Sequence, residues 1–397
     1  MEAYLLDWAN LLLRWFHLIA GIAWIGASFY FVMLDNSLKA PKKPEDTKRG
    51  VFGELWAVHG GGFYCSQKFP TGPKGEPLSN DLHWSKWEAY STWLSGMSLL
   101  AVVYWIGASN TLIDARVMDL TPAAAVGIAV AFLTVGWLVY DTLCRNLVGR
   151  DGLLAGIVFV FVMICNYALF HIFSARGAYI HVGAMLGTMM SANVFFHIIP
   201  GQKRMVEQIR AGQPVDSMPG IIGKQRSVHN TYFTLPVLII MISNHYPMTY
   251  GNANGWLVLA VLMLAGVLIR QFFVLRHRGQ QKWWLPAAGA ALIVALIVLM
   301  APKGIDTGGK KISFAEAKQV IDQRCVSCHA AQPTREGFVQ PPKGVMLENA
   351  TQIGQHIAKI KETVTSGYMP LGNLTGMTDE ERNLILVWAA QGARLTD

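Results

Sequence analysis

The run LLAGIVFVFVMICNYALFHIF, from Leu153 to Phe173, decides the fold of this chain. It contains no Asp, Glu, Lys or Arg over roughly twenty residues, the length that a helix needs to cross the hydrocarbon core of a bilayer. A helix also pairs the backbone polar groups of such a segment internally, which lipid cannot do. The run therefore predicts a transmembrane helix.

Similar apolar runs recur along the first three quarters of the chain. Of the 397 residues, 52% are hydrophobic and only 15% are charged, against about 25% charged in an ordinary soluble domain. We expect the first run to be a permanent span, since no small-residue cleavage site follows a short apolar core. The runs predict about eight spans in a lipid bilayer, at Trp8–Leu34, Trp87–Ala108, Pro122–Tyr140, Leu153–Phe173, Ala178–Ile199, Val228–Tyr246, Asn254–Leu275 and Trp284–Ala301.

The positive charges predict how these helices are oriented. The net charge is +8, but the basic residues lie in short loops between apolar runs, so we expect no nucleic-acid partner. Alternate loops, beginning with the first, hold eight, two, five and four Lys and Arg residues, whereas the others hold only Arg116 and Arg176. Cytoplasmic loops carry the basic excess. We therefore expect a multi-pass protein of the bacterial inner membrane, with its N-terminus and C-terminal region on the periplasmic side.

The composition changes after Ala301, which predicts a second domain. We divide the chain into a membrane domain (1–301), a linker (302–311) and a small soluble domain (312–397). Helices are expected at Phe314–Arg324 and Ala350–Thr365, and a third follows a capping box that begins at Thr378. A core of this size is marginal alone and needs a cofactor or a cross-link. The predicted fold is all-α: a transmembrane bundle followed by this domain.

The motif Cys325-Val326-Ser327-Cys328-His329 predicts the cofactor of the soluble domain. Two thiols at this spacing can each bond one vinyl group of a single haem, and the adjacent His then becomes the proximal iron ligand. Half of a zinc site is the alternative, but the domain offers only His356 as a further good ligand. The motif therefore favours one covalent haem c, and the domain resembles a small class I cytochrome c.

Met369 is the expected second axial ligand of this haem. It lies in Gly367-Tyr368-Met369-Pro370-Leu371-Gly372-Asn373, where the proline stiffens an irregular loop. A thioether ligand raises the reduction potential and favours electron acceptance. Met346 and Met377 are the rivals, but each is more typical of a core or loop residue.

Three histidines in the outer half of the predicted spans suggest a second haem. His17 is followed by the small residues Gly21 and Gly26, and His181 lies near Gly183 and Gly187. Small residues let a flat macrocycle approach a helix, and two histidines on facing helices can bind haem b. One hypothesis is therefore a haem b held by His17 with His181 or His245. The alternative is that each histidine hydrogen-bonds a neighbouring helix.

The first cytoplasmic loop contains an unusual stretch, Phe52 to Tyr64, with Gly60-Gly61-Gly62 after His59. Glycines beside aromatic residues permit close backbone approach to a planar ligand. A flexible loop is the simpler interpretation, and both remain open at this point.

These segments together resemble a known family, the bacterial membrane-bound, cytochrome c–linked urate oxidases (urate hydroxylases). The resemblance rests on the stretches 17–26, 53–64, 84–93 and 230–236, and on spans followed by a Cys-x-x-Cys-His domain. It implies oxidation of urate to 5-hydroxyisourate, with electrons leaving through haem c and without direct use of O2. The external electron acceptor stays open between a soluble cytochrome c and a terminal oxidase.

If the substrate is urate, we expect it to enter from the cytoplasm, where a His or Glu can act as base. The hydrocarbon core is roughly 30 Å thick, so an intermediate carrier such as haem b would then be needed to reach haem c. Oxidation at the outer face would need haem c alone. A different reading is a non-enzymatic membrane anchor that carries a cytochrome c for a quinol-dependent system. The candidate residues of a urate site are Glu54, His59, Glu88, His229 and Asn230.

Overall fold

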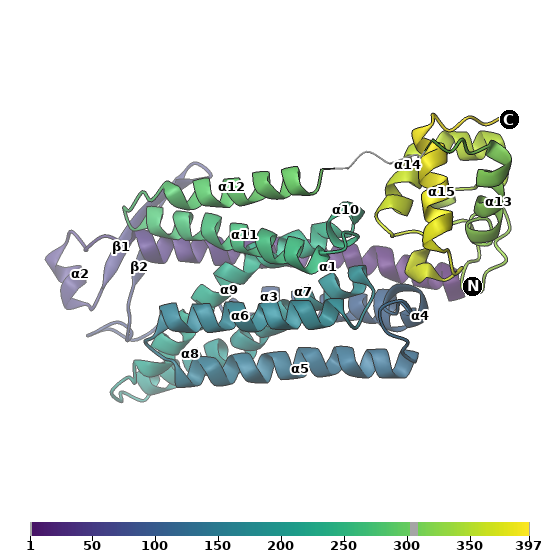
Figure 1. Cartoon of the computed structure of the whole chain (residues 1–397). Helices are drawn as coiled ribbons and strands as arrows, with labels where there is room; N and C mark the ends of the chain where they lie inside the picture. The colour runs from purple at the N-terminus through teal and green to yellow at the C-terminus, as the bar shows by residue number, and fades with distance from the viewer. Residues whose placement is uncertain (1, 302–308, 397) are drawn as a thin grey trace.

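The computed structural model describes residues 2–301 and 309–396, and shows a bundle of long helices with a smaller helical unit at one end (Figure 1). Helices occupy all eight segments that the apolar runs predict. Most of the predicted linker, residues 302–308, lies outside the described residues. The long helices are α1 (Glu2–Ser37), α3 (Trp87–Leu100) continued by the π-helical turn η1 (Ala101–Trp105), α5 (Pro122–Asn146), α6 (Asp151–Phe170), α7 (Ala175–Ala192) joined through the π-helical turn η2 (Asn193–Ile198) to α8 (Ile199–Arg210), α9 (Met218–Ser243), α11 (Gly255–His277) and α12 (Trp284–Leu299).

Five helices in the described part of the chain are long and apolar enough to cross a membrane. Of the other three segments, α12 has 16 residues, α3 has 14 before its π-helical turn, and α9 carries several polar residues. These properties are compatible with a membrane protein, and the count of eight spans stays a prediction. The five are Tyr4–Ser37, Pro122–Asn146, Asp151–Phe170, Ala175–Arg210 and Gly255–His277.

Helix α7 lies in the middle of the bundle and contacts α3, α5, α6 and α9. Gly183 of α7 and Gly136 of α5 allow two of these close approaches, because a side chain at either position would collide with the neighbouring helix. A Cβ at Gly183 would come within 2.7 Å of Ile240 Cγ2, and a Cβ at Gly136 within 2.8 Å of Met185 Sδ. Small residues at helix interfaces are the usual means of tight packing between apolar helices.

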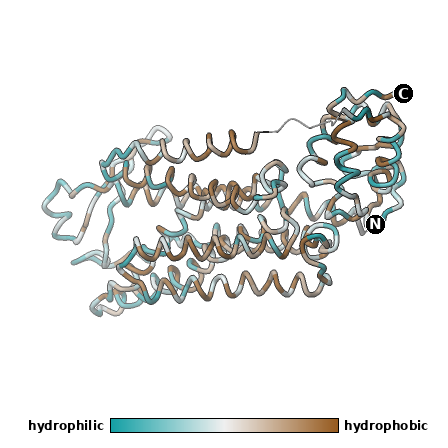
Figure 2. Tube along the Cα trace, viewed as in Figure 1, coloured by the Kyte–Doolittle hydropathy of each residue, from teal (hydrophilic) through white to brown (hydrophobic). Residues whose placement is uncertain are grey.

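The outer faces of the bundle carry large apolar side chains. Leu138, Val160, Ile164 and Ile297 are each more than half exposed. Figure 2 shows hydrophobic residues along the length of the long helices, and hydrophilic ones concentrated in the connections at the end where α2 (Pro44–Lys48) lies. An apolar surface of this extent needs a cover other than water.

The first loop contains a β-hairpin, so the all-α prediction is wrong there. Strands β1 (Gly53–His59) and β2 (Gly62–Lys68) form an antiparallel hairpin. Gly60 and Gly61 make its two-residue turn with φ angles of 59° and 82°, a conformation that glycine adopts without strain. The glycines that suggested a ligand contact therefore have a structural reason, which is the reversal of the chain.

The C-terminal unit contains the three helices that the sequence predicts: α13 (Phe314–Arg324), α14 (Ala350–Thr365) and α15 (Asp379–Ala390). Each begins with a reciprocal capping box, formed by Ser313, Asn349 and Thr378 with the residue three positions later. Their apolar faces meet in a separate core that includes Ile321, Ile353, Ile360, Val364, Ile385 and Trp388.

Candidate functional site

A cavity of about 480 Å³ lies between α1, α3, α7 and α9. Its lining is mainly apolar, and polar side chains reach it at few points, among them His17, Thr92, Asn244 and His245. A mostly apolar cavity with a few polar groups is typical of cofactor and ligand sites. Four glycines also line it: Gly21, Gly96, Gly183 and Gly187.

The His17 ring is held in a defined orientation at this cavity. Its Nδ1 lies 3.0 Å from the carbonyl oxygen of Thr92 and 3.0 Å from Ser95 Oγ. Gly96 leaves room for the ring, since a Cβ there would lie 2.9 Å from His17 Cε1. When Nδ1 donates to the Thr92 carbonyl, Nε2 is left with its lone pair, as in histidines that bind metals.

The structure places His245 on the same cavity as His17, but leaves His181 outside its lining. His181 is fully buried, and both ring nitrogens have protein partners. Its Nδ1 lies 2.8 Å from the carbonyl oxygen of Gly177, and its Nε2 accepts a hydrogen bond of 3.3 Å from Trp105 Nε1. Among the three histidines, His17 and His245 therefore fit a shared ligand better.

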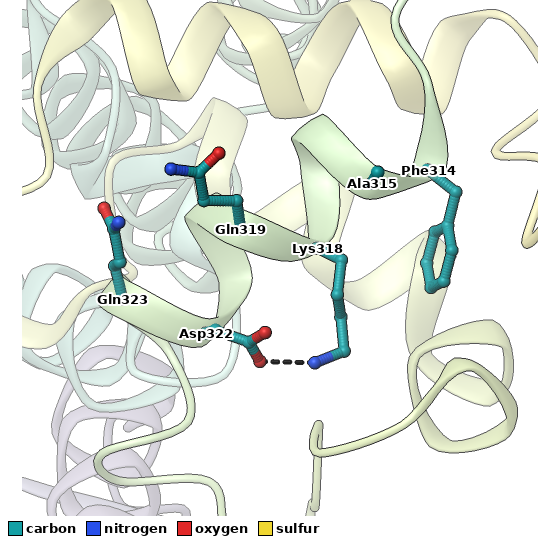
Figure 3. Close-up of a pocket in the computed structure, with 6 residues that line it drawn as sticks. All are labelled: Phe314, Ala315, Lys318, Gln319, Asp322 and Gln323. Atoms are coloured by element: carbon teal, nitrogen blue, oxygen red, sulfur yellow. Dashed lines mark hydrogen bonds and ion pairs between the residues drawn. The ribbon is translucent and has the colours of Figure 1, made fainter. Parts of the chain in front are cut away.

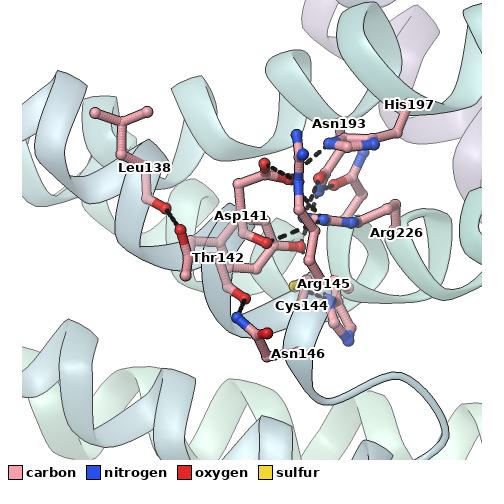
Figure 4. Close-up of polar contacts among 12 residues, drawn as sticks. Leu138, Asp141, Thr142, Cys144, Arg145, Asn146, Asn193, His197 and Arg226 are labelled. Carbon is pink, nitrogen blue, oxygen red and sulfur yellow. Dashed lines mark hydrogen bonds and ion pairs between the residues drawn. The ribbon is translucent and has the colours of Figure 1, made fainter.

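A buried polar network lies between α5, η2 and α9, and is centred on Asp141 (Figure 4). Asp141 Oδ1 accepts hydrogen bonds of 2.6 Å from Arg226 Nη2 and 2.6 Å from His197 Nε2. Its Oδ2 accepts a bond of 2.7 Å from Arg145 Nε. Arg226 is 1% exposed, so its charge depends on this partner.

The network continues from Arg226 to His229 through amide and hydroxyl groups. Arg226 Nη1 donates to Asn193 Oδ1 over 3.2 Å, and Asn193 Nδ2 donates to Asn230 Oδ1 and to the Tyr140 hydroxyl over 2.8 and 2.9 Å. The Tyr140 oxygen lies 2.8 Å from His229 Nδ1. Titratable groups are thus joined by continuous hydrogen bonds, and the π-helical turn η2 supplies His197 and the linking amide of Asn193.

His229 and Asn230 were candidates from the sequence, whereas Asp141, Asn193 and Arg226 were not. Asp141 and Arg226 lie just beyond the inner ends of two predicted spans and have opposite charges. That pattern is the only signal in the sequence that could have suggested their pairing.

Glu54, His59 and Glu88 lie in other elements. Glu54 lies in strand β1, and its backbone pairs with that of Lys39. His59 is exposed at the tip of the hairpin. Glu88 lies in the first turn of α3. Within residues 2–301 and 309–396, no hydrogen bond or ion pair joins these three to the Asp141 network. Their assignment to a urate site stays a prediction.

In the C-terminal domain, the Cys-x-x-Cys-His segment turns back directly after α13. The backbone N–H groups of Cys328 and His329 both donate to the carbonyl oxygen of Cys325, over 3.2 and 3.0 Å. His329 Nδ1 lies 2.9 Å from the carbonyl oxygen of Val345. A histidine fixed through Nδ1 offers Nε2 to iron, so this segment fits the donor set of a haem c.

The loop with Met369 is held by α15. Arg382 Nη1 donates to the Met369 carbonyl over 2.7 Å, and Arg382 Nη2 to Asn373 Oδ1 over 3.1 Å. The rival Met377 is 3% exposed and belongs to the core. The burial of Met377 is in keeping with the core position expected for it, and axial ligation by Met369 stays a prediction.

Burial changes the pKa values of two groups near the Cys-x-x-Cys-His segment. Burial raises the pKa of the free Cys325 thiol to about 12. Burial also raises the pKa of Glu381, but hydrogen bonds from Arg324 outweigh it, and the pKa lies below its ordinary value. Arg324 Nη2 lies 2.9 Å from Glu381 Oε1, which ties α13 to α15.

A surface hollow on α13 offers no functional site. An open hollow on α13, lined by Phe314, Lys318 and Gln319, contains mainly a surface ion pair between Lys318 and Asp322 (Figure 3). Among the described residues, no three or more His, Cys, Asp or Glu side chains gather in a way that could hold a metal ion.

The model of the urate oxidase N-terminal family matches residues 3–301. The chain belongs to this family. The match covers all the described helices before the C-terminal domain, and so includes both the His17 cavity and the Asp141 network. No curated protein and no solved structure matches the chain. Membership of the urate oxidase N-terminal family indicates an oxidoreductase that acts on urate.

Proposed function

We propose that this chain is a membrane-bound enzyme that oxidises urate to 5-hydroxyisourate and delivers the electrons to a haem c on its own C-terminal domain. The observation that carries the proposal is that the urate oxidase N-terminal match and the Cys325–His329 motif occur on one chain. A domain for urate chemistry fused to a haem-attachment motif supplies a source of electrons and a place for them to go.

The proposed reaction balances without O2. Urate and one water give 5-hydroxyisourate, two protons and two electrons. Haem c supplies a one-electron acceptor when bound by Cys325, Cys328 and His329, with Met369 as the second axial ligand. Two successive one-electron transfers therefore serve each urate. A soluble cytochrome c or a terminal oxidase is the proposed final acceptor.

We assign proton removal to the Asp141 network, with His229 as the candidate base. Proton transfer needs a tuned group within hydrogen-bond reach of the reacting atoms. His229 Nδ1 is paired with Tyr140, whereas its Nε2 has no hydrogen-bond partner among the described residues. Asn230 lies beside it, and its amide is bonded to Asn193 and to the Met190 carbonyl, so its proposed role is to hold the network in place beside the substrate.

The His17 cavity is the proposed site of a haem b. Gly187 supports this fit, because no atom lies within 4 Å of a Cβ placed there, so its backbone faces open space in the cavity wall. The cavity also adjoins the Asp141 network. Thr234 lines it and donates a hydrogen bond of 2.9 Å to the Asn230 carbonyl. The cavity is therefore the neighbouring site that would receive electrons from a urate bound at the network.

The proposed location is the bacterial inner membrane, with the C-terminal domain in the periplasm. The hairpin and the C-terminal domain lie at opposite ends of the bundle (Figure 1). The hairpin end carries the loops rich in Lys and Arg, which favours a cytoplasmic position for it.

Anaerobic addition of urate to the purified, oxidised protein tests the proposal. We expect the reduced spectrum of haem c to form with urate alone, at two electrons per urate. Reduction by a quinol but not by urate would refute the enzyme and support a non-enzymatic electron-transfer subunit. Pyridine haemochrome analysis of the same sample separates haem b from haem c. One haem c and no haem b per chain would remove the proposed relay.

A further inference from the structure

The Met369 loop, residues 367–373, contacts the end of the helical bundle where α7 begins. The hydroxyl of Tyr368 accepts a hydrogen bond of 3.4 Å from Arg176 Nη1, at the start of α7. The Tyr368 ring also meets Tyr250, with ring centroids 6.1 Å apart and an interplanar angle of 67°. Tyr250 ends the short helix α10 (Pro247–Tyr250), which follows α9.

The backbones of the Met369 loop and of the helical bundle also pack closely against each other. A Cβ at Gly251 would lie 2.1 Å from the carbonyl oxygen of Ser366, a distance that no side chain can adopt. A Cβ at Gly372 would lie 3.1 Å from the carbonyl oxygen of Ile113. The Met369 loop and the residue before it therefore pack directly on this end of the bundle, and at position 251 only glycine leaves enough space.

Arg176 connects this contact to the cavity wall. Its Nε donates a hydrogen bond of 2.8 Å to Asn244 Oδ1, which also accepts a bond of 3.1 Å from the Tyr104 hydroxyl. The guanidinium lies over the Tyr104 ring, 5.7 Å from its centroid. Asn244 and Tyr104 both line the cavity that contains His17 and His245. The Arg176 side chain thus contacts both the wall of this cavity and the Met369 loop.

A second set of contacts lies beside the first. Asp114 follows α4 (Ala108–Thr111) and is bonded to Arg116 over 2.7 Å. Burial alone would raise the pKa of Asp114, but Arg116 and, more weakly, Arg382 of the C-terminal domain hold it below its ordinary value. Arg382 is the residue that fixes the Met369 carbonyl. Charges of both domains therefore meet next to the loop.

We propose that Arg176 is a positioning residue that holds the Met369 loop against the outer end of the His17 cavity, so that electrons pass to the haem c of the same chain. The inference rests on the proposed function. One electron at a time leaves the cavity, reduces ferric haem c, and is then taken by the external acceptor. Arg176 itself is neither oxidised nor reduced. Its effect is to keep the donor and acceptor sites in contact.

Photo-crosslinking of the full, haem-loaded chain tests the docking without urate. Asn110 is the site for a photoreactive amino acid, because its side-chain amide would lie 3.2 Å from a Cβ at Gly337 and its carbonyl 3.8 Å from one at Gly372. We expect crosslinked peptides that contain residue 337 or 372. Gly251→Leu should lower their yield roughly tenfold, equivalent to about 1.4 kcal/mol of docking free energy. Gly127→Leu is the matched control, since nothing lies within 4 Å of its Cβ position.

The rate of haem c reduction then tests Arg176. Arg176→Gln should slow reduction by urate in a single turnover, whereas reduction by a small soluble reductant should be unchanged, because that reductant does not use the cavity. Tyr368→Phe should slow it less, since the ring contact with Tyr250 remains. Crosslinks that avoid residues 337 and 372, or equal yields in Gly251→Leu and Gly127→Leu, would overturn the inference. If urate fails to reduce the wild-type haem, the proposed function fails, and the crosslinks still decide the docking.

Discussion

The Asp141 network gives the sharpest test of how this bundle is stabilised. Replacing Asp141 with Ala removes the carboxylate that pairs with Arg226 and His197, each over 2.6 Å. Arg226 is 1% exposed, so the variant leaves a buried guanidinium without its counter-charge. The change therefore removes a partner and also leaves an uncompensated charge in the interior.

The size of the effect follows from these contacts. A hydrogen bond to a charged group contributes about 1.5–3 kcal/mol, and two such bonds are buried here. The third bond, from Arg145, adds less than about 0.5 kcal/mol, because the Arg145 side chain is 67% exposed. We expect Asp141→Ala to lower the free energy of unfolding by about 3–5 kcal/mol.

Unfolding of the detergent-solubilised protein by denaturant measures this difference. Asp151→Ala is the matched control: Asp151 begins the next helix and bonds Gln225 over 2.9 Å, but it is exposed. It should cost less than about 1 kcal/mol. Combining Asp141→Ala with Arg226→Met should cost about 1–3 kcal/mol less than the sum of the single changes, because the orphaned charge is gone. Strict additivity, or equal stability of Asp141→Ala and wild type, would refute the reasoning.

Three further outcomes are expected in the C-terminal domain. Replacing both Cys325 and Cys328 with Ser should remove the attached haem c, seen as a loss of covalent haem mass in the protein, whereas Cys65→Ser, at an exposed thiol, should leave it intact. Met369→Leu should lower the reduction potential of haem c in a spectroelectrochemical titration, and an unchanged potential would exclude this ligand. The pKa of Glu381 is lowered on folding, so the stability that it contributes is present above its ordinary value of 4.5 and is lost as the pH falls through the lower folded value. Glu381→Gln should flatten the fall of the unfolding temperature below pH 4.5, while Glu336→Gln, at an exposed position, should follow the wild type.

Features that depend on neighbouring residues in the chain could be predicted from the sequence. The apolar runs located all the long helices, because burial of a helix in an apolar medium requires an uninterrupted apolar stretch. The caps at Ser313, Asn349 and Thr378 involve residues three positions apart, so their partners are evident from local spacing. The Cys-x-x-Cys-His motif is local for the same reason.

The hairpin in the first loop shows where local reasoning fell short. Its strands are short, and the turn glycines at 60 and 61 could equally serve a ligand contact. In the structure β1 pairs with β2 over seven residues, and Glu54 of β1 also bridges to Lys39. Strand pairing depends on contacts between separate segments, which the spacing of residues within one segment does not reveal.

The sequence by itself determined which segments form the long helices and where each histidine lies along its helix, and it contains the motif on which the haem c prediction rests. Only the tertiary structure decided that His17 shares a cavity with His245 and that His181 is satisfied by Gly177 and Trp105. It likewise paired Asp141 of α5 with Arg226 of α9, two residues that are 85 positions apart in the chain. The physical reason is that the helical period fixes the depth and the face of a side chain along its own helix. Which neighbour that face meets depends on how whole helices pack, through glycine contacts between residues far apart in the chain.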